Sequence, residues 1–155
     1  MPKKDLTALA LPAVQDIASS DEDQLFTQLG KLVQMNRLDP KSVSDFVPSA
    51  EPEYETLGLA SDLKMFGKKY FDRVNAQAYN LVCGADAEDS AERKNLVTAF
   101  GLGKAEVTAS LAVLLVAQLA MAPAIATIVA ALTVKLFFSP AYDAMCEVWK
   151  GKLPG

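Results

Sequence analysis

The hydropathy pattern is dominated by one run, residues 107–134, in which 28 consecutive residues carry no charge. Nine of them are alanine, and most of the others are Leu, Val or Ile. The polar side chains do not align along one side of a helix, and a helix without a polar face has to be buried in protein or lipid. The polar groups deepest in this run, Gln118 and Thr127, are expected to bond to neighbouring backbone carbonyls.

Two helical geometries are compatible with this run. A single helix would be about 42 Å long, enough to cross a bilayer core of about 30 Å, with a kink at Pro123. Alternatively, the chain breaks at residues 120–122 and Pro123 takes the first position of a second helix. Neither arm of such a hairpin, about residues 104–121 and 122–138, has the roughly 20 apolar residues that a span needs. We favour the hairpin because Ala122, Ala126 and Ala130 give the second arm a small face on which another helix packs closely. The flanking Lys104 and Lys135 also show no asymmetry that would set an orientation in a membrane. A hairpin that is buried in water and released into membrane is the third alternative.

Helical periodicity also dominates the rest of the chain. Leu63, Phe66 and Tyr70 recur at helical spacing and predict a long amphipathic helix over about residues 60–83, with Val74 and Gln77 continuing its apolar face. No alternating run bounded by turn residues is present, as strands would require. Shorter helices are predicted after a cap at Ser20, after Asp39-Pro40, from Asp86 to about Phe100, and after a cap at Ser139.

Together these patterns predict an all-α protein, a compact bundle of about six to seven helices around a central hydrophobic hairpin. Residues 1–47 are expected to form an acidic segment of short helices that packs on the main bundle, with the first helix starting after Pro12. Residues 48–59, with two prolines and three glutamates, are expected to form a linker, and residues 60–155 the bundle itself. A length of 155 residues fits one domain overall.

The charge balance and the absence of histidine narrow the possible functions. The formal net charge is −4, and an acidic chain repels phosphate backbones, so nucleic acid is not an expected partner. The chain contains no histidine, which removes His-dependent nucleophiles, His general bases and His metal ligands. Carboxylate, Lys or Tyr chemistry is all that remains for an enzyme. We therefore expect no catalytic residue, no cofactor and no metal site.

Three patterns resemble ligand sites, and each has a simpler explanation. The glutamates within residues 51–55 fit a solvated loop. Asp86, Asp89 and Glu92 fit the positive N-terminal end of a helix dipole. Residues 101–104, Gly-Leu-Gly-Lys, lack the preceding Gly and the following Ser or Thr of a phosphate-binding loop, so they are expected to form a turn between helices.

The two cysteines, Cys83 and Cys146, lie far apart in sequence and outside any CxxC pair. We expect two buried, reduced thiols, because a disulfide between them would require an oxidising compartment. Asp5 and Pro12 interrupt the apolar run near the start, so a cleaved signal peptide is not expected there. The expected location is cytoplasmic, with membrane association as the alternative.

Two functional hypotheses follow. The first is a non-enzymatic helical interaction module that binds itself or another protein, for example as an accessory subunit of a larger complex. The second is a membrane-active protein whose hairpin inserts into lipid. The expected interface anchors are aromatic, because buried aromatic residues carry interface energy: Tyr79, Phe138, Tyr142 and Trp149. The hairpin residues expected to contact either the core or lipid are Leu114, Leu115, Pro123, Ile125, Val129 and Leu132.

Overall fold

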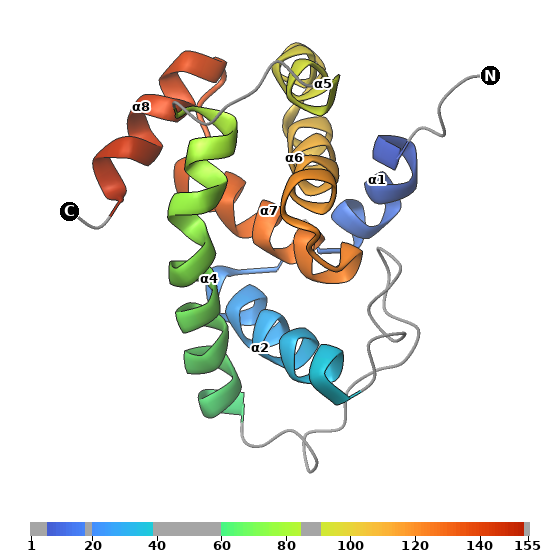
Figure 1. Cartoon of the computed structure of the whole chain (residues 1–155), viewed down its shortest axis with the longest axis vertical. Coiled ribbons are helices and arrows are strands. Elements are labelled where there is room, and N and C mark those ends of the chain that lie inside the picture. Colours follow the sequence, from blue (N-terminus) through green and yellow to red (C-terminus); the bar gives the residue numbers. More distant parts are fainter. Residues whose placement is uncertain (1–5, 18–19, 39–59, 85–90, 154–155) are drawn as a thin grey trace.

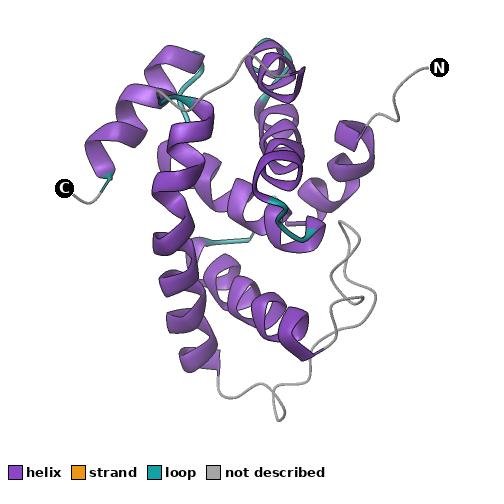
Figure 2. Ribbon diagram, in the orientation of Figure 1, coloured by secondary structure: helices purple, strands orange, loops and turns teal. Residues whose placement is uncertain are grey.

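The computed structural model describes residues 6–17, 20–38, 60–84 and 91–153. Within these ranges every regular element is a helix, as Figure 1 and Figure 2 show, and no strand occurs in them. The predicted all-α bundle is therefore confirmed. Its helices are α1 (Leu6–Ile17), α2 (Glu22–Leu38), α4 (Ala60–Val82), α5 (Ala91–Ala99), α6 (Lys104–Leu119), α7 (Pro123–Phe137) and α8 (Tyr142–Lys152).

The uncharged run forms two helices rather than one. α6 ends at Leu119, and Ala120 follows it in a left-handed conformation with φ of 52°. Pro123 is the first residue of α7, where its missing N–H costs no helical hydrogen bond. The two helices pack against each other. This confirms the predicted hairpin and its break at residues 120–122; below, "the hairpin" means α6, that turn and α7.

α7 is the central helix of the bundle. It contacts α1, α2, α6 and α8, and the seven consecutive residues from Ala124 to Ala130 are all buried. Because consecutive residues point in different directions around a helix, this burial means that every side of α7 is covered. Of the hairpin positions predicted for core or lipid, Pro123 is half-buried. The others lie in the core with at most 2% of their surface exposed: Leu114, Leu115, Ile125, Val129 and Leu132.

The arms of the hairpin are short. α6 has 16 residues and α7 has 15, so each is about 22–24 Å long, less than the roughly 30 Å of a hydrocarbon layer. Among the described helices, none alone combines the length and hydropathy of a membrane span. α7 and α8 taken together reach that length and hydropathy, but the two helices are bent by 90° at the break between them.

α2 begins with a reciprocal capping arrangement. The backbone N–H of Gln24 donates to Oδ1 of Asp21 at 2.8 Å, and the N–H of Asp21 donates to Oε1 of Gln24 at 2.9 Å. Both bonds satisfy N–H groups that have no partner within the helix. The cap is therefore Asp21 rather than the predicted Ser20. A carboxylate accepts the same bond and also adds a negative charge at the positive end of the helix dipole.

α2 and α4 cross through a pair of glycines. A Cβ on Gly67 would lie 1.9 Å from the carbonyl oxygen of Phe26, and a Cβ on Gly30 would lie 2.0 Å from that of Leu63. Only glycine allows backbones to approach so closely. Residue 26 meets residue 67 and residue 30 meets residue 63, so the two helices run antiparallel. The close approach also brings the rings of Phe26 and Phe71 into an edge-to-face contact with centroids 5.8 Å apart.

This crossing rotates the buried face of α4 from the predicted one. Leu63 and Val74 are buried as expected, but Gln77 is exposed, whereas Asn75 and Val82 are buried. The predicted face was centred on large apolar side chains. The observed buried face is instead the side of α4 that carries Gly67, where the backbone of α2 comes nearest. The helix itself, predicted over residues 60–83, is confirmed.

Two predicted helix starts are wrong. α1 passes through Pro12 instead of beginning after it, because burial of Ala10 and Val14 in a cluster with Ala109 of α6 compensates for the missing hydrogen bond. α8 begins at Tyr142 without a side-chain cap, so the cap predicted at Ser139 is not formed.

The described part of the N-terminal segment lies on the main bundle. α1 contacts α6 and α7, and α2 contacts α4 and α7. Other predictions lie outside the described residues: the linker at 48–59 with its glutamates, the short helix after Asp39-Pro40, and the acidic residues Asp86 and Asp89 before α5.

We expect Gly67→Ala to lower the free energy of unfolding by about 1–3 kcal/mol. The added methyl group would meet a backbone carbonyl, which cannot rotate away. Gly151→Ala is the matched control, because this helical glycine in α8 has nothing within 4 Å of the added Cβ. Higher helix propensity predicts a gain of at most about 1 kcal/mol for the control. Urea denaturation followed by circular dichroism measures both, and equal stability of the two variants would contradict the close crossing.

Candidate functional site

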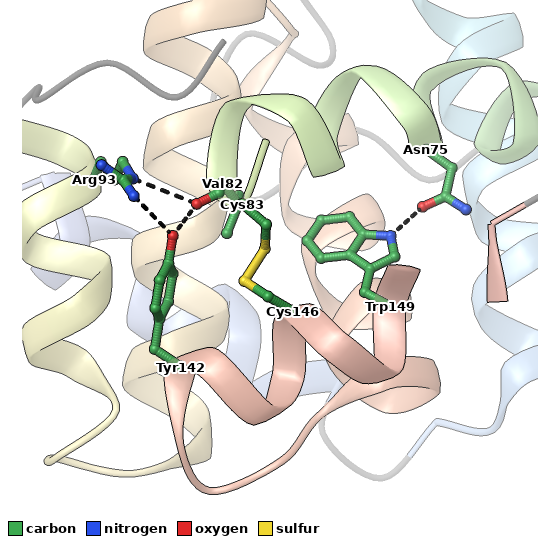
Figure 3. Close-up of a disulfide and its surroundings, with 7 residues drawn as sticks. All are labelled: Asn75, Val82, Cys83, Arg93, Tyr142, Cys146 and Trp149. Atoms are coloured by element: carbon green, nitrogen blue, oxygen red, sulfur yellow. Dashed lines mark hydrogen bonds between the residues drawn. A yellow bond between two sulfur atoms is a disulfide. The ribbon is translucent and has the colours of Figure 1, made fainter. Parts of the chain in front are cut away.

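α8 is attached to the end of α4 by side chains from one of its faces. Tyr142, Cys146 and Trp149 are spaced by four and three residues, so they lie on one side of the helix. Figure 3 shows all three directed at the last turns of α4, with Arg93 approaching from α5. We call the following set the α8 junction: Asn75, Val82, Cys83, Arg93, Tyr142, Cys146 and Trp149.

The covalent part of the α8 junction is a disulfide. Cys83 and Cys146 are 63 residues apart in sequence, with their Cα atoms 5.7 Å apart, a typical separation for bonded cysteines. The predicted pair of reduced thiols is therefore wrong. Cys83 directly follows the last residue of α4, and Cys146 lies in the middle of α8. The segment between the two cysteines contains α5 and the whole hairpin.

The carbonyl group of Val82, at the end of α4, is satisfied by side chains from two other helices. The Tyr142 hydroxyl donates to it, and Nε of Arg93 donates to it at 3.4 Å. Arg93 also donates from Nη2 to the Tyr142 hydroxyl at 3.1 Å. The last carbonyls of a helix lack partners within that helix, and cations are favoured near them. Arg93 and Tyr142 thus cap α4 and join it to α5 and α8.

Trp149 anchors the other end of the α8 junction. Its side chain is fully buried, and its indole N–H donates to Oδ1 of Asn75 at 2.8 Å. The ring stacks on Phe137 of α7 and makes an edge-to-face contact with the ring of Tyr79, with both centroid distances 5.5 Å. The hydrogen bond satisfies two buried polar groups at once. The structure therefore places Trp149 and Tyr79 at the contact of α8 with α4 and α7.

A second group of aromatic residues lies nearer the surface. The ring of Phe100 stacks on Phe138 at 6.1 Å and meets Tyr142 edge-to-face at 5.9 Å, and all three side chains are half-buried. The ammonium group of Lys104 lies 5.3 Å from the centre of the Phe138 ring. Leu102, two residues from both Phe100 and Lys104, is 69% exposed. We call Phe100, Leu102, Phe138 and Tyr142 the aromatic patch.

The four predicted anchors therefore divide into two pairs. Phe138 and Tyr142 come together in the aromatic patch, while Tyr79 and Trp149 contact each other further inside. Sequence reasoning missed the two residues that complete the patch. Leu102 carried a signal, because a leucine between two glycines in a turn is poorly placed for burial. A turn between helices was predicted at residues 101–104, and the connection between α5 and α6 covers residues 100–103.

Two observations concern the ionisable side chains of the described residues. Burial raises the pKa of Tyr70, and the positive charge of Arg73 only partly opposes this. A raised pKa keeps the hydroxyl protonated at neutral pH, the opposite of what a tyrosine base needs. Over the ranges that the structure describes, no three or more Cys, Asp or Glu side chains gather in a way that could hold a metal ion.

The polar side chains of the apolar run behave differently from each other. Thr127 is buried and donates to the carbonyl of Pro123 at 2.9 Å, as predicted. Gln118 is exposed near the end of α6, and its amide donates to Glu92 of α5 at 3.3 Å. The prediction that Gln118 is buried and bonded to a backbone carbonyl is therefore wrong, because Ala117 and Gln118 lie on an exposed side of the last turn of α6.

No protein-family model, curated protein or solved structure matches this chain. Its function is therefore inferred from its own residues.

We expect Cys146→Ser to lower the free energy of unfolding by about 4 kcal/mol, because the disulfide closes a long loop in the unfolded chain. Cys83→Ser and the reduced wild-type protein should lose the same amount, since all three lack the same bond. Urea unfolding with and without a thiol reductant measures the loss. A stability that reductant leaves unchanged would show that the bond does not form.

Proposed function

We propose that the protein is a non-enzymatic helical interaction module that associates with a second copy of itself through the aromatic patch. The observation that carries this proposal is the half-buried cluster of Phe100, Phe138 and Tyr142, with the exposed Leu102 two residues after Phe100. Aromatic residues are enriched at the centres of protein interfaces, where they carry most of the binding energy. Tyr142 is held by its hydrogen bonds to Val82 and Arg93 in the α8 junction, so its side chain would lose little conformational freedom on binding.

The charges around the patch favour a second copy as the partner. Lys104, at the start of α6, and Asp143, directly after Tyr142, are both exposed. A twofold symmetric interface brings the same surface together twice, so charged groups on that surface are complementary only when both signs are present. Lys104 of one copy can then pair with Asp143 of the other at the rim, where such pairs mainly set orientation.

The disulfide also bears on where this module works. The cytosol of most cells keeps thiols reduced, whereas secreted and periplasmic proteins retain disulfides. The Cys83–Cys146 bond therefore favours an oxidising compartment over the cytoplasm as the place where the oxidised form is active.

Leu102→Asp tests the interaction surface. We expect the wild-type protein to form a dimer as its concentration rises, and the variant to raise the dissociation constant by about tenfold or more. Met65→Asp is the matched control, because Met65 is also a large exposed apolar residue, 58% exposed, but lies on α4. Gel filtration with light scattering measures the mass of each protein across concentrations.

Two results would contradict the proposal. One is a wild-type protein that stays monomeric at the highest soluble concentration. The other is an equal effect of the Leu102 and Met65 substitutions, which would show that added charge, and not loss of the patch, weakens association.

A further inference from the structure

We propose that the hairpin is also a lipid-binding element, which enters the apolar layer of an anionic bilayer with its turn first once the Cys83–Cys146 disulfide is reduced. This function is independent of self-association through the aromatic patch. It follows from the polar groups of the hairpin, from the placement of its charges, and from the way the disulfide holds its cover.

The buried threonine hydroxyls of the hairpin are satisfied within their own helices. Thr108, Thr127 and Thr133 each donate to the carbonyl four residues earlier, at 2.9, 2.9 and 2.8 Å. In a bilayer, polar groups must be satisfied internally because no water is available. These three bonds do not depend on any other helix of the bundle. The hairpin can therefore leave its cover without exposing these hydroxyls to lipid unpaired.

The charges of the hairpin lie at the end opposite to its turn. Lys104 and Glu106 lie in the first turn of α6 and Lys135 in the last turn of α7, which leaves a net charge of +1 at this end. Both lysines are exposed, and Glu106 is half-buried. Between them, residues 107–134 are uncharged, and Ala120 in the turn is exposed. An orientation with the turn inward thus places both lysines at the headgroups, where an ammonium group stays hydrated and attracts anionic lipid.

The depth of entry is limited by length. Each arm is about 22–24 Å long, shorter than the hydrocarbon layer, so the turn reaches into the layer without an arm crossing it. Gln118 gives a second limit, because entry would break its bond to Glu92 and take its amide out of water at a cost. The expected state is a shallow hairpin and not a pair of spanning helices.

The disulfide connects the helices that cover the hairpin to the chain both before and after the hairpin. α2 covers α7, and α2 is joined to α4 through the glycine crossing. Cys83, at the end of α4, precedes the hairpin in the chain, and Cys146 follows it. With the bond intact, the α2–α4 pair is therefore tethered to both ends of the hairpin segment, which keeps its effective concentration at α7 high. Reduction leaves the tether on one side only.

The redox step needs a dithiol as the reductant. The Sγ–Sγ bond between Cys83 and Cys146 breaks and takes up two electrons and two protons to give two thiols. The dithiol loses the same electrons and protons and becomes a disulfide. Such exchange proceeds through a mixed disulfide after attack by a thiolate, and Cys83 and Cys146 are both half-buried residues.

Vesicle flotation tests the proposal. The proteins are the oxidised wild type, the wild type reduced with dithiothreitol, Cys146→Ser, and Cys146→Ser combined with either Ala120→Asp or Met65→Asp. The vesicles are phosphatidylcholine alone or mixed with phosphatidylglycerol. Ala120→Asp places a charge on the turn at an exposed, left-handed position that aspartate tolerates. Met65→Asp adds the same charge on the exposed side of α4.

We expect the reduced wild type and Cys146→Ser to float with the anionic vesicles, and the oxidised protein to stay at the bottom. Ala120→Asp should lower the partition coefficient by about a hundredfold, the cost of a charge within lipid, while Met65→Asp should leave it unchanged. The proposal is overturned if the reduced protein and Cys146→Ser fail to float. It is also overturned if the oxidised protein floats equally well, or if both added charges have the same effect, since binding would then be non-specific adhesion of a loosened chain.

Discussion

Burial of an uncharged run is the constraint on which the rest of the structure depends. α7 has no side that favours water, so it must have neighbours all round, and α1, α2, α6 and α8 provide them. Each covering helix therefore has to be fixed in place by something other than α7 itself. α2 is fixed by the glycine crossing with α4, and α8 by the disulfide, the Val82 cap and the indole–Asn75 bond. The specific contacts of the molecule thus lie between its covering helices.

The elements that could be predicted from the sequence are those set by local chemistry. Pro123 at the start of α7 follows from a missing N–H and a fixed φ, so the break in the uncharged run could be placed to within a residue. α4 follows from its periodicity, and the turn at residues 101–104 from its two glycines. Phe138 and Tyr142 were expected among four aromatic anchors, but nothing in the sequence separated them from Tyr79 and Trp149, which lie further inside.

The features that were missed depend on contacts between distant segments. Whether Cys83 and Cys146 are bonded depends on where α8 lies, which no local pattern contains. Gly67 was passed over because a helical glycine is informative only once α2 is placed against it. That contact also turned the buried face of α4 away from Gln77 and towards Asn75. Gln118 was misplaced because the extent of the cover over α6 is likewise a tertiary property.

The two proposed surfaces lie at opposite ends of the hairpin, the aromatic patch at its charged end and the lipid-entering turn at the other. Both require that α7 be sheltered by its own chain in the oxidised protein. Amide hydrogen exchange of residues 124–130 measures this most directly, since slow exchange reports burial and hydrogen bonding that open only with global unfolding. We expect these amides to be among the slowest in the oxidised molecule and to exchange faster after reduction. Exchange in the oxidised protein as fast as at the exposed ends of α8 would contradict the account.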